Sequence, residues 1–283
     1  MKTFSRSLQL VALSLLLGAP VVAGTITVKG SDTMVILAQK WAEVYMRQKP
    51  ETKIQVTGGG TGTGFAALQN GQTDLCNASR KIKAKEVAEC VKVFNKRPTE
   101  YTVAIDGLAV YVSADNPVTE LTLDQLDQIF TGKIKNWKEV GGPDAPITVY
   151  SRENSSGTYE FFKEHVLKGK DFTSSAQTMP GTAAVLQAVA KDKNGIGYGG
   201  AGYGAGAKHL NIKADDDSPA VEPTEENVVG QKYPLWRYLY VYVNPALDKG
   251  EIAAYLNWIR SGDGQKVVKD QAYFPLPENL RSK

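Results

Sequence analysis

The sequence predicts an α/β protein with a mostly parallel sheet. Short apolar runs alternate with patterns of helical period along the N-terminal part of the chain. Small, hydroxyl-rich turns follow several of the predicted strands, and open α/β sheets bind ligands beyond the carboxyl ends of their strands. The chain has 283 residues, which is long enough for one large domain or two lobes. No internal repeat divides it, and no linker is rich enough to separate independent domains.

The predicted strands and helices follow one another along the chain. Strands are expected at residues 26–28, 54–57, 74–76, 102–105, 109–113, 147–150, 195–200 and 239–243. Helices are expected at residues 41–47, 65–68, 84–90, 121–130, 183–190 and 252–259. Thr122 is the expected cap of the helix at 121–130, and Thr131-Gly132 its end. Alternation of this kind is typical of βαβ units. The glycine-rich stretch 199–206 is similar to a dinucleotide loop, but no clear amphipathic helix follows, so a turn is expected there.

The N-terminus has the pattern of a secretory signal peptide. Lys2 and Arg6 form a basic start, residues 8–17 are apolar but too few to span a bilayer, and Val21-Val22-Ala23 offers small residues for cleavage. Residues 1–23 are therefore predicted to be removed and the mature protein to be periplasmic; a membrane anchor is the alternative. The first cysteine is Cys76, so no lipid attachment is expected at the cleavage point.

The charge balance excludes some classes of partner. The formal net charge is +3, and it falls to about +1 when the two basic residues of the leader are removed. A nearly neutral chain is not suited to broad electrostatic binding of nucleic acid or anionic lipid, so neither partner is expected.

Cys76 and Cys90 are the only cysteines. Export permits a disulfide between them, and two buried thiols are the alternative. The only histidines, His165 and His209, do not have metal-ligand spacing with the cysteines, so no metal site is expected.

The segment 151–158 carries the strongest functional signal. It places Arg152 and several hydroxyls just before an apolar, aromatic run that predicts a helix. The first backbone N–H groups of a helix are unpaired and carry partial positive charge. With an arginine beside them, they can hold a tetrahedral oxyanion. An ordinary capped helix with a surface arginine is the alternative.

Three other turns repeat this chemistry, each after a predicted strand. They are Gly30-Ser31-Asp32-Thr33, Gly58–Gly64 and Ala78-Ser79-Arg80. Because ligands of α/β sheets bind where strands end, the four turns could converge on one small anion.

The four motifs together, in this order, resemble the phosphate-binding proteins of phosphate-specific ABC transporters, the PstS-type family. The resemblance covers essentially the whole mature chain. It implies a periplasmic-binding-protein-like fold of two α/β lobes joined by two crossover strands, near 109–113 and 239–243. One lobe would comprise residues 24–108 plus 244–283, and the other residues 109–243.

The resemblance also implies that inorganic phosphate binds in the cleft between the lobes and is delivered to an inner-membrane ABC permease complex. A monomer without a cofactor and without enzymatic activity is expected. The phosphate-binding residues carried over by motif are Ser31, Asp32, Thr33, Thr61, Gly62, Ser79, Arg80, Arg152, Ser155, Ser156, Gly157 and Thr158.

This chain departs from some relatives at Arg80, where they carry an aspartate that accepts a proton from phosphate. Asp32 is the substitute candidate for that acceptor, and its alternative role is to cap the first helix. Arg80 would either contact phosphate or pair with Asp32. Thr61 stands where relatives often have serine, and the role of Ser155 is open because this loop is usually richer in glycine.

Three other functions are weighed against phosphate transport. One is a binding protein for another oxyanion, such as sulfate, molybdate or a phosphonate. Another is an exported phosphatase or phosphotransferase with Ser156 as nucleophile. Two observations argue against this enzyme: the motifs contain no histidine that could act as a base, and no P-loop lysine follows residues 58–64. The third is an extracellular role in adhesion or phosphate sensing.

Overall fold

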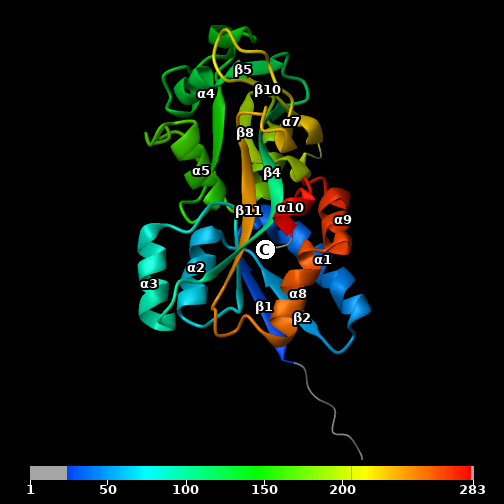
Figure 1. Ribbon diagram of the computed structural model, residues 1–283. Coiled ribbons are helices and arrows are strands. Elements are labelled where there is room, and N and C mark those ends of the chain that lie inside the picture. Colours follow the sequence, from blue (N-terminus) through cyan, green and yellow to red (C-terminus); the bar gives the residue numbers. More distant parts are fainter. Residues whose placement is uncertain (1–23, 205, 282–283) are drawn as a thin grey trace, which may run out of the picture.

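The computed structural model of the protein describes residues 24–204 and 206–281. Within these residues the fold is a mixed α/β fold of two lobes that share one curled, nine-stranded sheet (Figure 1). Two long strands, β4 (Thr99–Ser113) and β11 (Trp236–Val243), run antiparallel to each other between the lobes. The predicted leader, residues 1–23, lies outside the described residues. No helix of the described part has the length and apolar character needed to cross a bilayer.

The first lobe has a parallel core in the order β2-β1-β3, to which β11 adds antiparallel. Its strands are β1 (Thr25–Gly30), β2 (Lys53–Thr57) and β3 (Leu75–Ala78). Its helices are α1 (Val35–Gln48), α2 (Thr61–Gln69), α3 (Ala84–Phe94), α8 (Gly250–Arg260) and α9 (Gly262–Asp270). Figure 1 shows α2 and α3 on one side of the sheet and α1 and α8 on the other. The lobe therefore combines segments from both ends of the chain.

In the second lobe the sheet continues from β4 through β8 and β6 to β7, and β9 also pairs with β4. The strands are β6 (Thr148–Arg152), β7 (Gln177–Met179), β8 (Gly195–Gly200) and β9 (Ala207–His209), with β5 (Glu120–Thr122) and β10 (Asn211–Lys213) as a separate parallel pair. The helices are α4 (Leu123–Phe130), α5 (Gly157–His165), α6 (Thr182–Lys191) and α7 (Glu225–Val229). The short helix α10 (Glu278–Arg281) ends the described chain near the junction of the lobes (Figure 1).

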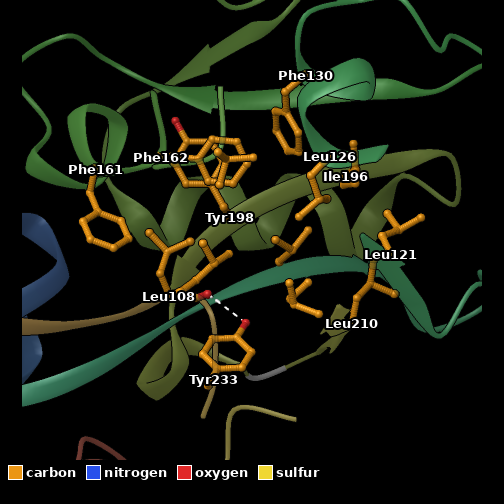
Figure 2. Close-up of a cluster of buried hydrophobic side chains, with 14 of the residues drawn as sticks. Leu108, Leu121, Leu126, Phe130, Phe161, Phe162, Ile196, Tyr198, Leu210 and Tyr233 are labelled. Atoms are coloured by element: carbon orange, nitrogen blue, oxygen red, sulfur yellow. Dashed lines mark hydrogen bonds between the residues drawn. The ribbon is translucent and has the colours of Figure 1, made fainter. Parts of the chain in front are cut away.

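An aromatic core anchors α5 in the second lobe. Phe162, the inward-facing aromatic of this helix, stacks on Tyr198 with ring centroids 4.2 Å apart and meets Phe130 at 4.6 Å (Figure 2). All three side chains are buried. Because such packing tolerates little movement, it holds the start of α5 in a defined position.

The strand β4 differs from the prediction. The sequence predicts two strands, 102–105 and 109–113, whereas the structure has a single one. Gly107 lies within this strand, where a Cβ would come within 2.9 Å of Val228. Glycine inside a strand often marks such a close approach. The predicted cap of α4 is confirmed, since the Thr122 hydroxyl accepts from the Gln125 N–H.

The expected disulfide is not present. Cys76 and Cys90 are both free and buried, which was the alternative. The Cys76 thiol donates to the carbonyl of Asn77 at 3.7 Å and packs beside Gly64. The buried thiol therefore has a hydrogen-bond acceptor and close packing without a bond to a second sulfur. Burial raises the pKa of both thiols.

Candidate anion-binding site

Both lobes contribute residues to one polar site at their junction. The turns after β1, β2 and β3 face the loop between β6 and α5. The Gly62 N–H donates to the Ser155 carbonyl at 2.9 Å, and the hydroxyls of Thr33 and Thr158 lie 2.6 Å apart. The carboxyl ends of the parallel strands β1, β2 and β3 meet at one edge of the sheet. The strand β6 runs antiparallel to them across β11, β4 and β8, so it brings the fourth turn to the same place from the other lobe.

The first turn is held rigidly by the rest of the chain. The Ser31 N–H donates to the carbonyl of Asn77, and a short 3-10 helix, Asp32–Met34, follows. The Tyr203 hydroxyl donates to the Asp32 carbonyl at 2.6 Å, and the Tyr273 hydroxyl donates to the Thr33 carbonyl. Burial raises the pKa of Tyr203 to about 12, so this tyrosine stays protonated and keeps donating at neutral pH.

Ser31 itself carries a buried hydroxyl with no partner among the described residues. A buried polar group without a hydrogen bond is uncommon and calls for an explanation. A ligand with acceptor oxygens would satisfy it.

The second and third turns bring Thr61 and Ser79 together. The Ser79 N–H donates to the Thr61 hydroxyl at 3.1 Å, and the two hydroxyl oxygens are 3.4 Å apart. Gly60, just before Thr61, has a φ of +90°, and a Cβ on it would lie 2.6 Å from the Ser155 carbonyl oxygen. Glycine is needed here because the opposite lobe touches the backbone.

The start of α5 completes the opposite wall. The Ser156 hydroxyl accepts from the N–H groups of Thr158 and Tyr159, both at 3.2 Å, so the predicted capped helix is confirmed. Gly157 is the first helical residue and lies against the hydroxyls of Thr61 and Ser79. The positive end of the helix therefore points at the cluster of hydroxyls.

Arg152 is a buried cation of the site. Its side chain is only 1% exposed. Its Nη2 donates to Asp32 Oδ2 at 2.9 Å and to Glu153 Oε1 at 2.7 Å, while Nε donates to Glu153 Oε2 and Nη1 to the Thr182 hydroxyl. The guanidinium, which is always charged, is thus oriented by both lobes.

Two carboxylates flank this cation. Asp32 Oδ1 accepts from the Gly59 N–H at 2.7 Å, and Oδ2 accepts from Arg152. Burial alone would raise the pKa of Glu153, but the hydrogen bonds and charge of Arg152 outweigh it and lower that pKa. A site with one guanidinium between two carboxylates is better suited to an anion that carries its own protons than to a fully deprotonated one.

Arg80 pairs with Glu86, which rules out one of its two expected partners, Asp32, and leaves contact with phosphate as a prediction. Its Nη1 and Nη2 donate to the two carboxylate oxygens of Glu86 on α3, at 2.8 and 2.7 Å, and its guanidinium lies over the ring of Phe65. Asp32 pairs instead with Arg152. The expected pairing of Arg80 with Asp32 is therefore wrong, because Glu86 lies on the next helix of the same lobe and binds the guanidinium with both oxygens.

Sequence reasoning missed four polar residues around the site: Asp106, Glu153, Thr182 and Arg237. Asp106 and Arg237 are buried in β4 and β11. Arg237 is the one charged residue of β11, and Asp106 is the one charged residue in the apolar run 103–112 of β4. This was the signal that could have found them, since charges are rarely buried without a partner. Ser155 contributes its carbonyl to Gly62 and its hydroxyl to the Gly59 carbonyl, so it links the lobes.

Comparison with known proteins assigns the chain to a family. A family model described as the PBP superfamily domain matches residues 18–263. The phosphate-binding protein PstS of Pseudomonas aeruginosa is 37% identical over 93% of this chain and 86% of its own length. The PstS of Bacillus subtilis is 33% identical over 90% of this chain and 82% of its own length.

Solved structures show the same architecture. A phosphate ABC transporter substrate-binding protein from Clostridium perfringens, with bound phosphate, superposes with a TM-score of 0.82 at 29% identity and covers 90% of this chain and 100% of its own. An ABC-type phosphate transport receptor from Vibrio cholerae has a TM-score of 0.68 at 28% identity and covers 89% of this chain and 100% of its own. The chain therefore belongs to the PBP superfamily and, within it, to the PstS family of phosphate-binding proteins.

Proposed function

We propose that this protein binds inorganic phosphate with high affinity between its lobes and delivers it to an ABC permease for import. The observation that carries the proposal is that four turns from both lobes meet at one polar site, which holds the buried Arg152 and the Ser31 hydroxyl, a buried group with no partner among the described residues. The phosphate-bound relative from Clostridium perfringens supports it. Phosphate is too small to gain affinity from buried apolar area, so preorganised polar bonds must supply it.

The phosphate-binding residues of this proposal are Ser31, Asp32, Thr33, Thr61, Gly62, Ser79, Arg152, Ser156, Gly157 and Thr158. Arg80 stays a further candidate, because Glu86 binds its Nη1 and Nη2 while its buried Nε has no partner among the described residues. Ser155 serves by linking the lobes rather than by binding the ion.

Asp32 is the proposed acceptor of the phosphate proton. Phosphate carries at least one proton at neutral pH, and sulfate carries none. Leaving a buried neutral polar group without a hydrogen bond costs about 1–3 kcal/mol of free energy. Placing a carboxylate against an unprotonated oxyanion costs more than that, because two negative charges then face each other. The site would therefore discriminate against sulfate by repulsion. The variant Asp32→Asn should narrow the preference for phosphate over sulfate in competition titrations; an unchanged preference would remove Asp32 from this role.

Calorimetric titration of the purified protein, freed of bound phosphate, tests the function. One-to-one binding of phosphate without heat from sulfate is expected. Binding of sulfate instead, or of neither ion, would overturn the proposal and favour another oxyanion or another class of function. The variant Arg152→Ala should weaken phosphate binding severely, whereas the exposed arginine variant Arg47→Ala on α1 should bind like the wild type.

The lobe division is proposed as residues 24–108 plus 244–283 and residues 109–243, with β4 and β11 as the crossover strands. The protein acts as a periplasmic monomer after its leader is cleaved, binds no nucleic acid and catalyses no reaction. Its relatives are named as phosphate-binding proteins, which supports a binding role rather than a catalytic one. Delivery to the permease is tested by adding the phosphate-loaded protein to the reconstituted transporter and measuring ATP hydrolysis, which should rise only with protein and phosphate together.

A further inference from the structure

A buried ion pair joins the two long strands beside the proposed phosphate cradle, whose two walls are the turns after β1, β2 and β3 and the start of α5. Asp106 on β4 and Arg237 on β11 are opposite each other in the strand register. Their side chains are 0% and 4% exposed. Asp106 Oδ2 accepts from Arg237 Nε at 3.0 Å and from Nη2 at 2.7 Å. Asp106 Oδ1 also accepts from the Ala201 N–H at 3.3 Å. Two buried charges need many good hydrogen bonds to be tolerated, and this pair has them.

The remaining donors of Arg237 reach both walls of the cradle. Nη1 donates to the Ser79 carbonyl of the first lobe at 3.1 Å, and Nη2 donates to the Thr158 hydroxyl of the second lobe at 3.0 Å. One guanidinium therefore bonds a residue of each wall. It can make both bonds only when the lobes are together.

The bond to Thr158 decides which way that hydroxyl points its proton. A threonine hydroxyl has one proton and two acceptor lone pairs. Arginine has no acceptor and keeps its protons at physiological pH, so it always takes a lone pair of Thr158. The Thr158 proton must then point elsewhere, towards the Thr33 hydroxyl 2.6 Å away or towards an anion in the cradle.

We propose that Arg237 is a positioning residue for phosphate binding. It keeps the Thr158 hydroxyl as a donor towards the ion and couples that orientation to closure of the lobes. Asp106 holds the guanidinium in place and offsets its charge, so that the ion meets a polarised hydroxyl instead of a second full cation. This inference rests on the proposed function and adds to it a specific role for a pair outside the binding loops.

A double-mutant cycle on phosphate affinity tests the coupling. The first variant is Arg237→Lys, which keeps a positive charge for Asp106 but cannot supply three directed bonds at once. It should weaken phosphate binding by about tenfold or more, as expected for loss of a hydrogen bond involving a charged group. In a Thr158→Val background, Arg237→Lys should lower phosphate affinity by less than about twofold, because the hydroxyl that Arg237 orients is absent. In a Thr158→Ser background, which restores a hydroxyl, Arg237→Lys should again cause the full loss of phosphate affinity.

Equal losses in the Thr158→Val and wild-type backgrounds would overturn the inference, because Arg237 would then act independently of Thr158. No loss in the wild-type background would overturn it as well. If Arg237→Lys folds poorly, the neutral pair Asp106→Asn with Arg237→Gln replaces it in the same cycle. Thermal unfolding of each variant shows whether it is folded.

A matched control lies just before β11. Tyr233 is buried and donates to the Leu108 carbonyl of β4 at 3.0 Å, outside the cradle (Figure 2). The variant Tyr233→Phe should lower stability and leave phosphate affinity unchanged; a matching loss of affinity would show that any disturbance of β4 suffices. A wild-type protein that does not bind phosphate would overturn the proposed function and this inference together, whereas the cycle can overturn the inference alone.

Discussion

Replacing Gly157 by alanine should prevent closure of the lobes while leaving the fold intact. A Cβ on Gly157 would lie 2.7 Å from the Ser79 hydroxyl oxygen, 2.9 Å from the Thr61 Cβ and closer still to the Thr61 hydroxyl oxygen. Ordinary contacts to a Cβ are 3.4–4 Å. The two walls must therefore separate by about 1 Å to accept the methyl group.

A separation of this size breaks the bonds that close the site. The Gly62–Ser155 bond is 2.9 Å and the Thr33–Thr158 contact 2.6 Å, and both would approach or exceed the useful limit for a hydrogen bond. Phosphate would lose about two bonds from one wall, each worth about 1.5–3 kcal/mol to a charged group. That corresponds to a loss of affinity of about a hundredfold to ten-thousandfold. Stability should not fall, because alanine is the better helix former by up to about 1 kcal/mol.

The control is Gly262→Ala. Gly262 is also the first residue of a helix capped by a serine, but no atom beyond its chain neighbours and its own helix backbone lies within 4 Å of the position that a Cβ on it would occupy. Both variants are titrated with phosphate in the calorimeter and unfolded thermally. An affinity of Gly157→Ala within about threefold of the wild type, or an equal loss in Gly262→Ala, would refute the prediction.

Three further predictions concern stability and reactivity. Phe162→Ala should cost about 3–5 kcal/mol in urea unfolding, because it removes a ring that is stacked in the core; a loss below about 1 kcal/mol would contradict the described packing. Cys76 and Cys90 should react with an alkylating reagent at pH 7 only after unfolding, because their pKa values are raised and little thiolate forms; rapid labelling of the native protein would argue against buried thiols. The folded-state pKa of Glu153 is lowered from 4.5, so its stabilising contribution is present above that pH and is lost as pH falls through the folded value. The stability difference between wild type and Glu153→Gln should therefore shrink as the pH falls below 4.5 towards the folded-state value, and a difference that stays constant with pH would contradict this prediction.

Local patterns were sufficient for much of the fold and for most residues of the proposed site. The hydroxyl-rich turns after strands and the capped helix after Arg152 are visible in the sequence because caps and strand ends depend on neighbouring residues. The cap by Ser156 and the meeting of the four turns agree with that reasoning. The use of each turn residue in phosphate binding stays a prediction.

The partners of charged and sulfur-containing side chains were decided only by the tertiary structure. Arg80 pairs with Glu86 rather than Asp32, and Cys76 stays a free thiol. Asp106 and Arg237, which are 131 residues apart in the chain, meet because their strands pair in register. Sequence spacing determines which face of a strand or helix a residue occupies, but the partner across an ion pair depends on how distant elements pack. Burial then selects among the possible pairs, since an unpaired charge inside the protein is too costly to keep.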